Sequence, residues 1–594
     1  MKKDYSKYRS NFIMQAGILA VAGIIVRIIG LLYRAPLTAV IGDEGNGYYS
    51  FAYNIYTNIL LISSYSIPSA ISKIMSQKLA LKEYKNTQRI FKCALIYVTV
   101  VGGIAAAFAY FAAGILVVDN AVPVLRIFAP TIFLSGFLGV LRGFFQAHRS
   151  MVPTSISQII EQIINACVSI GAAFLFIRMA GGIDVSETSK AVRGASGSAL
   201  GTGSGVLAAL IFVGCVYLYN RKTIKARCDA DTESEIEPYS GIFKDILLIV
   251  TPFILSTFIY NCSTAVNQTI FAKIMLGNNI PQARISMQYG IYSGKAVVLR
   301  NVPVAIASAM SSAIIPTVAS SWVLKDKKSA RSKTARAVKV TMLVAIPCVS
   351  VFLFLARPVV TILFPQRSSL VMASRLLMAL AITVVFYCIS TITNGVLQSI
   401  GQVHKPVTHA AIALIAQSVV LWGLLTFTGM GIFSIVIADI VFSLLVCILN
   451  GRTLRKVMHY HQNSVDTFLL PGICALFMGI IARLVYDLVY HFSHINIVSF
   501  IVAALIGAVF YVITVIQSRA LDDDEISLIK GGSEIFEFMK RHHLISDNPK
   551  FRIITRIDQA RSNRQTNRRR SAKYDHKDRD YLDDDPDDFD DADE

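Results

Sequence analysis

Two arginines lie inside the first long apolar stretch of the sequence, residues 12–41. This stretch is long enough to cross a bilayer, and an arginine at the centre of a membrane helix costs about 2.5–3.5 kcal/mol on insertion scales. Arg27 and Arg34 are separated by two helical turns and therefore project from one face, with Gly30 between them. Such a face is best tolerated where it lines a wet cavity that holds an anion.

A second interpretation is that Arg34 snorkels to the interface and Arg27 pairs with a neighbouring carboxylate. We favour the cavity for Arg27, and both interpretations stay open for Arg34.

The composition indicates an all-α, multi-pass membrane protein. Of the 594 residues, 54% are hydrophobic and only 16% are charged, whereas a soluble domain has about a quarter of its residues charged. The nine cysteines show no paired spacing, so neither a disulfide framework nor a metal site is expected. The net charge of +19 does not indicate a nucleic-acid partner, because the lysines and arginines alternate from loop to loop, as the positive-inside rule predicts.

About fourteen apolar segments are long enough to span a membrane. They lie near 12–41, 48–75, 91–118, 122–146, 154–178, 194–219, 242–272, 285–320, 338–357, 371–400, 406–427, 430–450, 467–490 and 495–517. The first carries charge and lacks a cleavage site, so we expect it to be retained. The distribution of basic loops predicts that both termini are cytoplasmic.

The two halves of the chain repeat weakly. Tyr53–Tyr56 matches Tyr289–Tyr292, and Gly143–Gln146 before a proline matches Gly395–Gln398 before another. Corresponding basic loops fall on one side, which predicts a parallel repeat of six helices. The expected domains are an N-terminal six-helix lobe, a cytoplasmic linker, a C-terminal six-helix lobe, two additional helices and a cytoplasmic tail, at 1–220, 221–241, 242–450, 451–518 and 519–594.

The tail is basic and then acidic, with few apolar residues, so we expect it to be largely disordered.

Glycines mark packing in the expected helices and turns. Gly194, Gly197, Gly201 and Gly205 have the spacing of a close helix–helix contact. Residues 42–47 contain three glycines and predict a turn between helices. The sequence has no Walker A motif, so no ATP site is implied.

Polar residues recur at helical spacing within several apolar segments. For an asparagine or glutamine, an interhelical hydrogen bond worth under about 1 kcal/mol is the simplest explanation. A charged residue inside an apolar segment requires a counter-charge, and we expect Glu161 to neutralise an arginine or lysine. Asp439 has no evident partner, whereas Arg483 and Asp487 form an i,i+4 pair.

Arg27 and Arg34 in one half and Lys295 in the other predict a cationic cavity between the halves. Arginine forks suit bidentate contacts with phosphate, and a lysine adds a point charge. A lipid with a pyrophosphate head group fits such a site. The candidate substrate-binding residues are Arg27, Arg34, Lys295, Arg300, Glu161, Asn54, Asn261 and Gln268. No catalytic residue, metal site or cofactor is predicted, and a coupling ion is left open.

Several motifs resemble the multidrug/oligosaccharidyl-lipid/polysaccharide exporter superfamily over residues 10–517. They are Arg27-x-x-Gly30-x-x-Tyr33-Arg34-x-Pro36, Gly45-x-Gly47-x-Tyr49-x-x-Ala52-Tyr53, Pro68-x-Ala70-Ile71-Ser72-Lys73 and Tyr289-Gly290-Ile291-Tyr292-x-Gly294-Lys295. Within it, they are most similar to the Gram-positive MurJ and stage V sporulation protein B-like lipid II flippase branch.

This resemblance implies a fourteen-helix protein with two six-helix lobes around a central cationic cavity, and a groove for the lipid tail at the last two helices. It implies essential roles for Arg27, and for Arg34 with a one-residue shift, and a basic position near Lys295. The branch's second-helix arginine has no counterpart, because residues 53–66 contain no basic residue.

The combined expectation is a flippase, not an enzyme, that moves lipid II from the inner to the outer leaflet of a bacterial plasma membrane by alternating access, as a monomer. The alternatives are a flippase for another lipid-linked oligosaccharide or polysaccharide, a sporulation-specific paralogue, and a multidrug/cation antiporter. The antiporter would require an acidic cavity instead of arginines. A glycosyltransferase would require a carboxylate- or histidine-bearing extramembrane loop, which the sequence lacks.

Overall fold

The computed structural model describes residues 22–23, 25–65, 67–179, 186–232, 236–364 and 366–518, with the backbone alone at 65, 249–257, 259–260 and 313. Every regular element in these ranges is a helix, which confirms the all-α prediction. The chain divides into two compact units, Met1–Val512 and Ile513–Glu594, and the helix packing below lies within the first. The expected tail at 519–594 falls outside the described residues.

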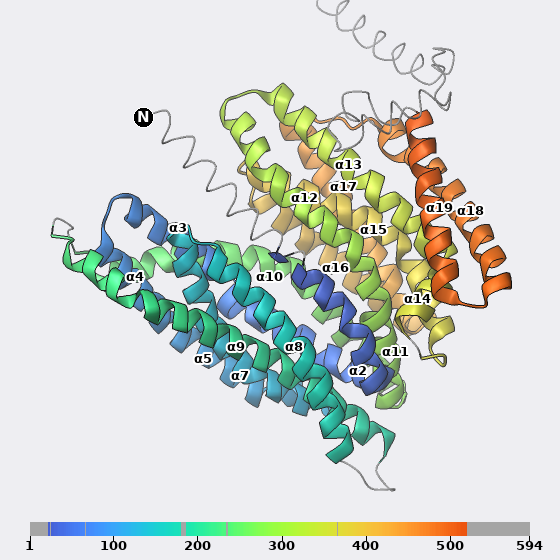
Figure 1. The fold of residues 1–594 in the computed structure, drawn as a ribbon, viewed down its shortest axis with the longest axis horizontal. Helices are drawn as coiled ribbons and strands as arrows, with labels where there is room; N and C mark the ends of the chain where they lie inside the picture. The colour runs from blue at the N-terminus through green and yellow to red at the C-terminus, as the bar shows by residue number, and fades with distance from the viewer. Residues whose placement is uncertain are drawn as a thin grey trace, which may run out of the picture. The chain divides into compact units, whose positions relative to one another are not determined.

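The N-terminal set of helices packs around α7 and α9 (Figure 1). Residues 25–32 are helical and lead into α2. Short π-helical turns, Leu61–Tyr65 and Val98–Gly102, join α2 to α3 and α4 to α5. The helices are α2 (Arg34–Leu60), α3 (Ile67–Ala80), α4 (Tyr84–Tyr97), α5 (Gly103–Phe111), α6 (Ala113–Leu116), α7 (Val122–Ala147), α8 (Val152–Met179) and α9 (Glu187–Asp229).

The C-terminal set packs around α15, which contacts α12, α13 and α17. Its helices are α10 (Tyr239–Gly277), α11 (Gln282–Ile291), α12 (Val297–Val323), α13 (Lys327–Phe354), α14 (Ala356–Leu363), α15 (Leu370–Ser399), α16 (His404–Phe427) and α17 (Phe433–Met458). A π-helical turn, Tyr292–Ala296, joins α11 to α12. The last two helices, α18 (Leu470–Ser493) and α19 (Asn496–Gln517), follow, and α18 packs against α13.

The connection between the two sets is shorter than the expected linker at 221–241. Helix α9 ends at Asp229 and α10 begins at Tyr239. The division into lobes and additional helices stays a prediction.

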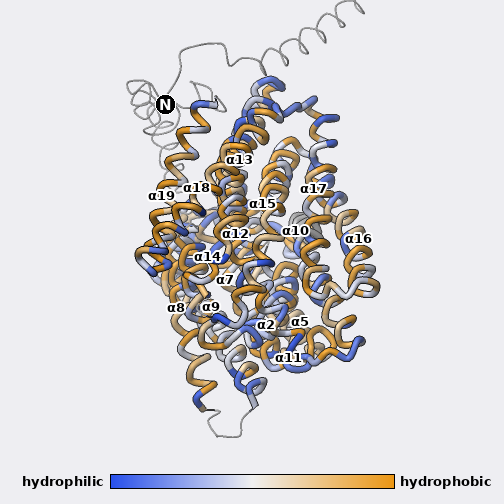
Figure 2. Tube along the Cα trace, turned by 90° about the vertical axis from the view of Figure 1, so that its right-hand side faces the viewer, coloured by the Kyte–Doolittle hydropathy of each residue, from blue (hydrophilic) through white to orange (hydrophobic). Residues whose placement is uncertain are grey.

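Twelve helical stretches among the described residues are long and apolar enough to span a membrane. Figure 2 shows apolar residues along the helices and polar residues gathered at helix ends. The expected count of fourteen is not confirmed. Residues 12–21 and 24 of the first expected span, 12–41, lie outside the described residues, and α10, which covers the expected span 242–272, is not among the twelve.

The predicted glycine contact joins α8 and α9. A Cβ atom on Gly197 would lie 2.5 Å from the Ala172 carbonyl oxygen, and one on Gly205 would lie 2.5 Å from that of Glu161. Because both neighbours are backbone atoms, neither can move aside without shifting a helix. The prediction of close packing by small residues is confirmed.

The predicted turn at 42–47 is only partly correct. Helix α2 is interrupted at Gly42, whose φ of 71° and ψ of 177° lie outside the helical region. Residues Asp43–Gly47 are already helical again. The remaining two glycines serve close packing. A Cβ on Gly45 would lie 3.0 Å from the Ala191 carbonyl oxygen of α9, and one on Gly47 would lie 1.9 Å from that of Ser286 of α11.

We expect Gly197→Ala to lower the stability of the folded protein by about 1–3 kcal/mol, because the added methyl overpacks the α8–α9 contact. The matched control is Gly214→Ala on the same helix, since Gly214 has no neighbouring atom within 4 Å of the added Cβ. There the better helix propensity of alanine should leave stability unchanged or raised. Thermal unfolding in detergent measures both, and equal melting temperatures for the two variants would contradict the assignment.

Candidate functional site

The two helix sets approach each other most closely where α2 crosses α11 (Figure 1). Besides the Gly47 contact, a Cβ on Gly290 would lie 2.0 Å from the Asp43 carbonyl oxygen. The rings of Phe51 and Tyr289 stack across this crossing, with centroids 4.6 Å apart. Asn54, within the motif Tyr53–Tyr56, donates a hydrogen bond of 3.0 Å to the Tyr289 hydroxyl, so this motif meets the matched motif Tyr289–Tyr292 at the junction.

A buried ion pair locks this crossing. The Lys295 ammonium lies 2.6 Å from the Asp43 carboxylate, with side-chain exposures of 1% and 8%. Lys295 also donates a hydrogen bond of 2.6 Å to the hydroxyl of Ser369, next to α15. Since Asp43 follows the break at Gly42 and Lys295 lies in the π-helical turn, each charge is presented where its helix is irregular. Lys295 thus joins the two sets and lines neither of the two cavities described below.

Polar side chains extend the junction along α2. The amide of Asn54 donates to Gln268 of α10 at 2.8 Å and to the hydroxyl of Tyr289 at 3.0 Å. The amide of Gln268 donates in turn to the Phe51 carbonyl at 2.9 Å. Asn54 and Gln268, both candidates from the sequence, are therefore brought together as interface contacts between the two helix sets.

A cavity of about 230 Å³ lies beside this junction and contains arginines from both sets. Arg34 of α2 and Arg300 of α12 both line it. The remaining lining is rich in tyrosine and polar residues, including Tyr49, Tyr53, Asn54, Asn267, Tyr289, Tyr292, Asn301, Tyr387 and Asp439. Two guanidinium groups among hydroxyl and amide groups make a site suited to a phosphate-bearing polar ligand.

A second cavity of about 440 Å³ adjoins the first, because both are lined by Thr264, Arg300, Asn301 and Tyr387. Asn261, another candidate from the sequence, lines this second cavity together with Asn394 and Gln398. The candidate region is thus wider than the arginine pair alone.

Arg300 is held by a carboxylate that the sequence left without a partner. One guanidinium nitrogen is hydrogen-bonded to Asp439 of α17, and the group lies 4.7 Å from the centre of the Tyr387 ring. Asp439 also accepts hydrogen bonds from the hydroxyls of Tyr292, at 3.0 Å, and Tyr387, at 3.1 Å. These contacts fix Arg300 at the wall of the cavity and largely offset its charge.

The structure places two other candidates away from this pair of cavities. Arg27 is exposed and donates a hydrogen bond of 2.7 Å to the backbone carbonyl of Ala305 on α12, so it reaches the opposite helix set. Glu161 is paired with Arg142 of α7 at 2.7 Å, which confirms the expectation of a basic partner. The expected pair of Arg483 with Asp487 is also present, at 2.9 Å.

Sequence reasoning missed Asp43 and Asp439 as partners of Lys295 and Arg300. Each pair joins residues far apart in the chain, so helical spacing carries no signal for it. A general signal did exist, because a carboxylate and a cation inside apolar segments each require a counter-charge.

Polar cavities flanked by two sets of membrane-spanning helices define a transporter-like membrane protein. The model of the polysaccharide biosynthesis protein family matches residues 13–322, just over half of the chain, and the chain belongs to this family. A second family model, MatE, matches residues 298–423. The chain is therefore a multi-pass membrane protein of the multidrug/oligosaccharidyl-lipid/polysaccharide exporter superfamily, as the sequence motifs indicated.

The individual relatives have low sequence identity to this chain, but the alignments cover most of its length. The lipid II flippase MurJ of Bacillus subtilis (strain 168) is 23% identical over 425 residues, covering 68% of this chain and 75% of the relative. Stage V sporulation protein B of the same organism is 23% identical over 529 residues, covering 88% and 98%. A solved structure of the lipid II flippase MurJ in an inward closed conformation matches 84% of this chain and 97% of that chain, with a TM-score of 0.56 and 14% identity.

We expect the Asp43–Lys295 pair to be a major determinant of the contact between the helix sets. Asp43→Asn or Lys295→Met leaves a buried charge without its partner, which should cost about 3–5 kcal/mol. Asp487→Asn is the matched control, because it breaks the exposed pair with Arg483 and should cost about 1 kcal/mol or less. Thermal unfolding of the purified variants measures both.

The charge-reversed double variant Asp43→Lys/Lys295→Asp should recover part of this loss. Two single variants as stable as Asp487→Asn would show that the pair does not hold the crossing.

Proposed function

We propose that this protein is a flippase that translocates undecaprenyl-pyrophosphate-linked peptidoglycan precursor, lipid II, from the inner to the outer leaflet. It would act in the plasma membrane of a bacterium, with both termini cytoplasmic, and without a catalytic step. The similarity to the lipid II flippase MurJ over 68% of the chain supports this assignment. So does membership of the polysaccharide biosynthesis protein family.

The observation that carries the proposal is the shared cavity of Arg34 and Arg300. A pyrophosphate cannot cross the hydrocarbon core unaided, and the Arg34 guanidinium offers it bidentate hydrogen bonds in place of water, beside the Arg300 wall of the cavity. Tyrosine faces and amide groups beside the arginines suit the sugars of the head group, because they offer apolar rings and hydrogen-bond donors together. The polyprenyl chain stays in the lipid.

In the proposed cycle, the lobes expose the cavity first to one leaflet and then to the other. In this cycle the α2–α11 crossing, with its buried Asp43–Lys295 pair, would be the contact that closes one side. The head group neutralises the cavity cations and lets the lobes close around it. Release on the other side restores the repulsion between these cations and favours the return. Arg27, which already contacts α12 of the opposite set, would join the head group during this movement.

A flippase for another lipid-linked glycan is the main alternative. The similarity to stage V sporulation protein B over 88% of the chain supports this alternative. Residues 53–66 lack the second-helix arginine of the lipid II branch. The missing arginine would change the contacts that select the transported glycan. A multidrug/cation antiporter is disfavoured, because Asp439 is the one acidic residue that lines either cavity and it is already paired with Arg300.

We expect Arg27→Ala and Arg34→Ala to abolish lipid II translocation while leaving the protein folded and inserted. Arg34→Lys should retain part of the activity, because the charge stays but the bidentate fork is lost. The measurement is transfer of labelled lipid II across reconstituted vesicles, with transport of a cationic dye tested in parallel.

The matched control is Arg483→Ala, since this arginine is exposed and its pair with Asp487 lies outside the cavities. Full translocation by Arg34→Ala would refute the proposed site, and dye transport without lipid transport would favour the antiporter. Movement of a different lipid-linked glycan but not lipid II would establish the alternative flippase.

A further inference from the structure

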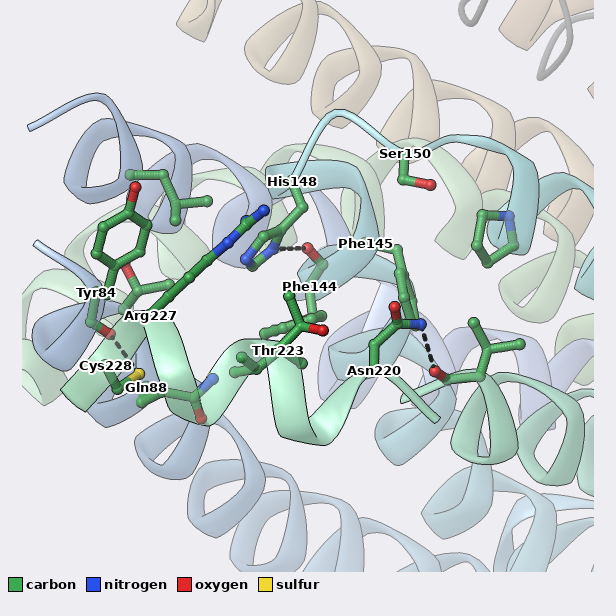
Figure 3. A pocket seen from close by; sticks show the side chains of 15 residues that line it. Tyr84, Gln88, Phe144, Phe145, His148, Ser150, Asn220, Thr223, Arg227 and Cys228 are labelled. Carbon is green, nitrogen blue, oxygen red and sulfur yellow. Dashed lines mark hydrogen bonds between the residues drawn. The ribbon is translucent and has the colours of Figure 1, made fainter. Parts of the chain in front are cut away.

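A third cavity, of about 230 Å³, lies entirely within the N-terminal helix set (Figure 3). It is bounded by the end of α3, the start of α4, the turn from α7 to α8, and the last turns of α9. None of its lining residues lines either cavity at the junction of the two sets. These helix ends adjoin the basic loops expected in the cytoplasm. The cavity therefore requires an explanation separate from the translocation site.

The most basic wall of this cavity is formed by His148 and Arg227 (Figure 3). The His148 Nδ1 atom lies 2.9 Å from the Phe144 carbonyl oxygen. Since a carbonyl only accepts hydrogen bonds, Nδ1 carries the proton and Nε2 is the atom left for another partner. Burial lowers the pKa of His148, the Phe144 carbonyl opposes this, and the positive charge of Arg227 adds to the lowering. Arg227 therefore disfavours the protonated form of His148, and an anion between the two groups would offset this effect.

The charge of Arg227 has no counter-ion among the described residues. No hydrogen bond or ion pair joins its guanidinium to them. No aspartate or glutamate lines the cavity. A site with a free guanidinium and no carboxylate favours an anionic ligand over a cation.

The neighbouring polar groups supply further hydrogen-bond donors. Gln88 and Thr223 line the cavity and have no hydrogen-bond partner among the described residues. The Asn220 amide is occupied by the Val216 carbonyl, at 2.8 Å, and the Cys228 thiol donates to the Tyr84 carbonyl, at 3.5 Å. Arg227, Gln88 and Thr223 thus supply side-chain donors to this cavity that are not hydrogen-bonded to other described residues.

The apolar wall is formed by Leu79, Phe144, Phe145 and Ile224, and the Phe144 ring lies against His148, with centroids 4.3 Å apart. An anion that carries a short aliphatic part, such as a phosphate ester, fits both walls better than a bare ion does.

We propose that this cavity is an accessory site for a phosphate group, held by Arg227 with Gln88, Thr223 and His148 as neighbouring contacts. The phosphate comes either from the head group of an anionic phospholipid or from a small soluble phosphate. The site is separate from the arginine pair at the junction and does not depend on the transported substrate.

The test uses the full-length protein in phosphatidylcholine nanodiscs, titrated with inorganic phosphate at constant ionic strength. Phosphate should raise the melting temperature of the unmodified protein. Arg227→Gln should weaken this response by about tenfold or more, because a charge-assisted hydrogen bond of about 1.5 kcal/mol or more is lost. The matched control is Arg221→Gln, because Arg221, like Arg227, is an exposed arginine of α9 but does not line the cavity. It should respond like the unmodified protein.

A second arm replaces part of the phosphatidylcholine with phosphatidylglycerol, without added phosphate. Stabilisation by this lipid that is lost in Arg227→Gln and kept in Arg221→Gln identifies a lipid head group as the ligand. A response to free phosphate alone identifies a soluble ligand. The proposal is overturned if both variants respond alike in both arms, or if neither phosphate nor phosphatidylglycerol changes the melting temperature. Because the readout is binding, failure here leaves the flippase proposal untouched, and failure of lipid II translocation leaves this site untouched.

Discussion

The structure depends on a single buried contact, the ion pair between Asp43 and Lys295. Two charges taken out of water are tolerated only when each satisfies the other, and here they come from helix sets that are otherwise joined by hydrogen bonds and van der Waals packing. The local backbone geometry positions the two charges of this pair. Gly42 breaks α2 just before Asp43, and Lys295 lies in a π-helical turn instead of a regular helix. The glycines at 47 and 290 then allow the two backbones to approach closely enough for the charges to meet.

A division of tasks among the basic residues follows from this arrangement. Lys295 and Arg300 are each bound to a carboxylate, so one secures the junction and the other forms a fixed wall of the cavity. Arg34 shares that cavity, and Arg27 reaches across to the opposite helix set. The sequence grouped Arg27, Arg34 and Lys295 as one cationic lining and placed Arg300 among the candidate binding residues, whereas the structure separates the cations that are neutralised within the protein from those that are not.

Features set by local spacing could be predicted from the sequence, and features set by tertiary pairing could not. The α8–α9 contact followed from glycines one helical turn apart, and the pair of Arg483 with Asp487 followed from an i,i+4 spacing. The partners of Lys295 and Arg300 lie in other helices, and their identity depends on how the helix sets dock. The interpretation of 42–47 as a turn had the same cause, because glycines required by a neighbouring helix look identical in sequence to glycines required by a turn.

The contact of Arg27 with the Ala305 carbonyl has an electrical consequence. A carbonyl dipole positions a guanidinium but does not cancel its charge, and within the described residues no carboxylate is paired with Arg27 or Arg34. In the proposed flippase, the empty carrier would therefore keep a net positive charge inside the membrane, whereas a bound pyrophosphate would bring the loaded carrier close to neutrality. A voltage across the membrane would then act mainly on the return of the empty carrier, so that an interior-negative potential would draw its cations back toward the cytoplasm and reset the cycle.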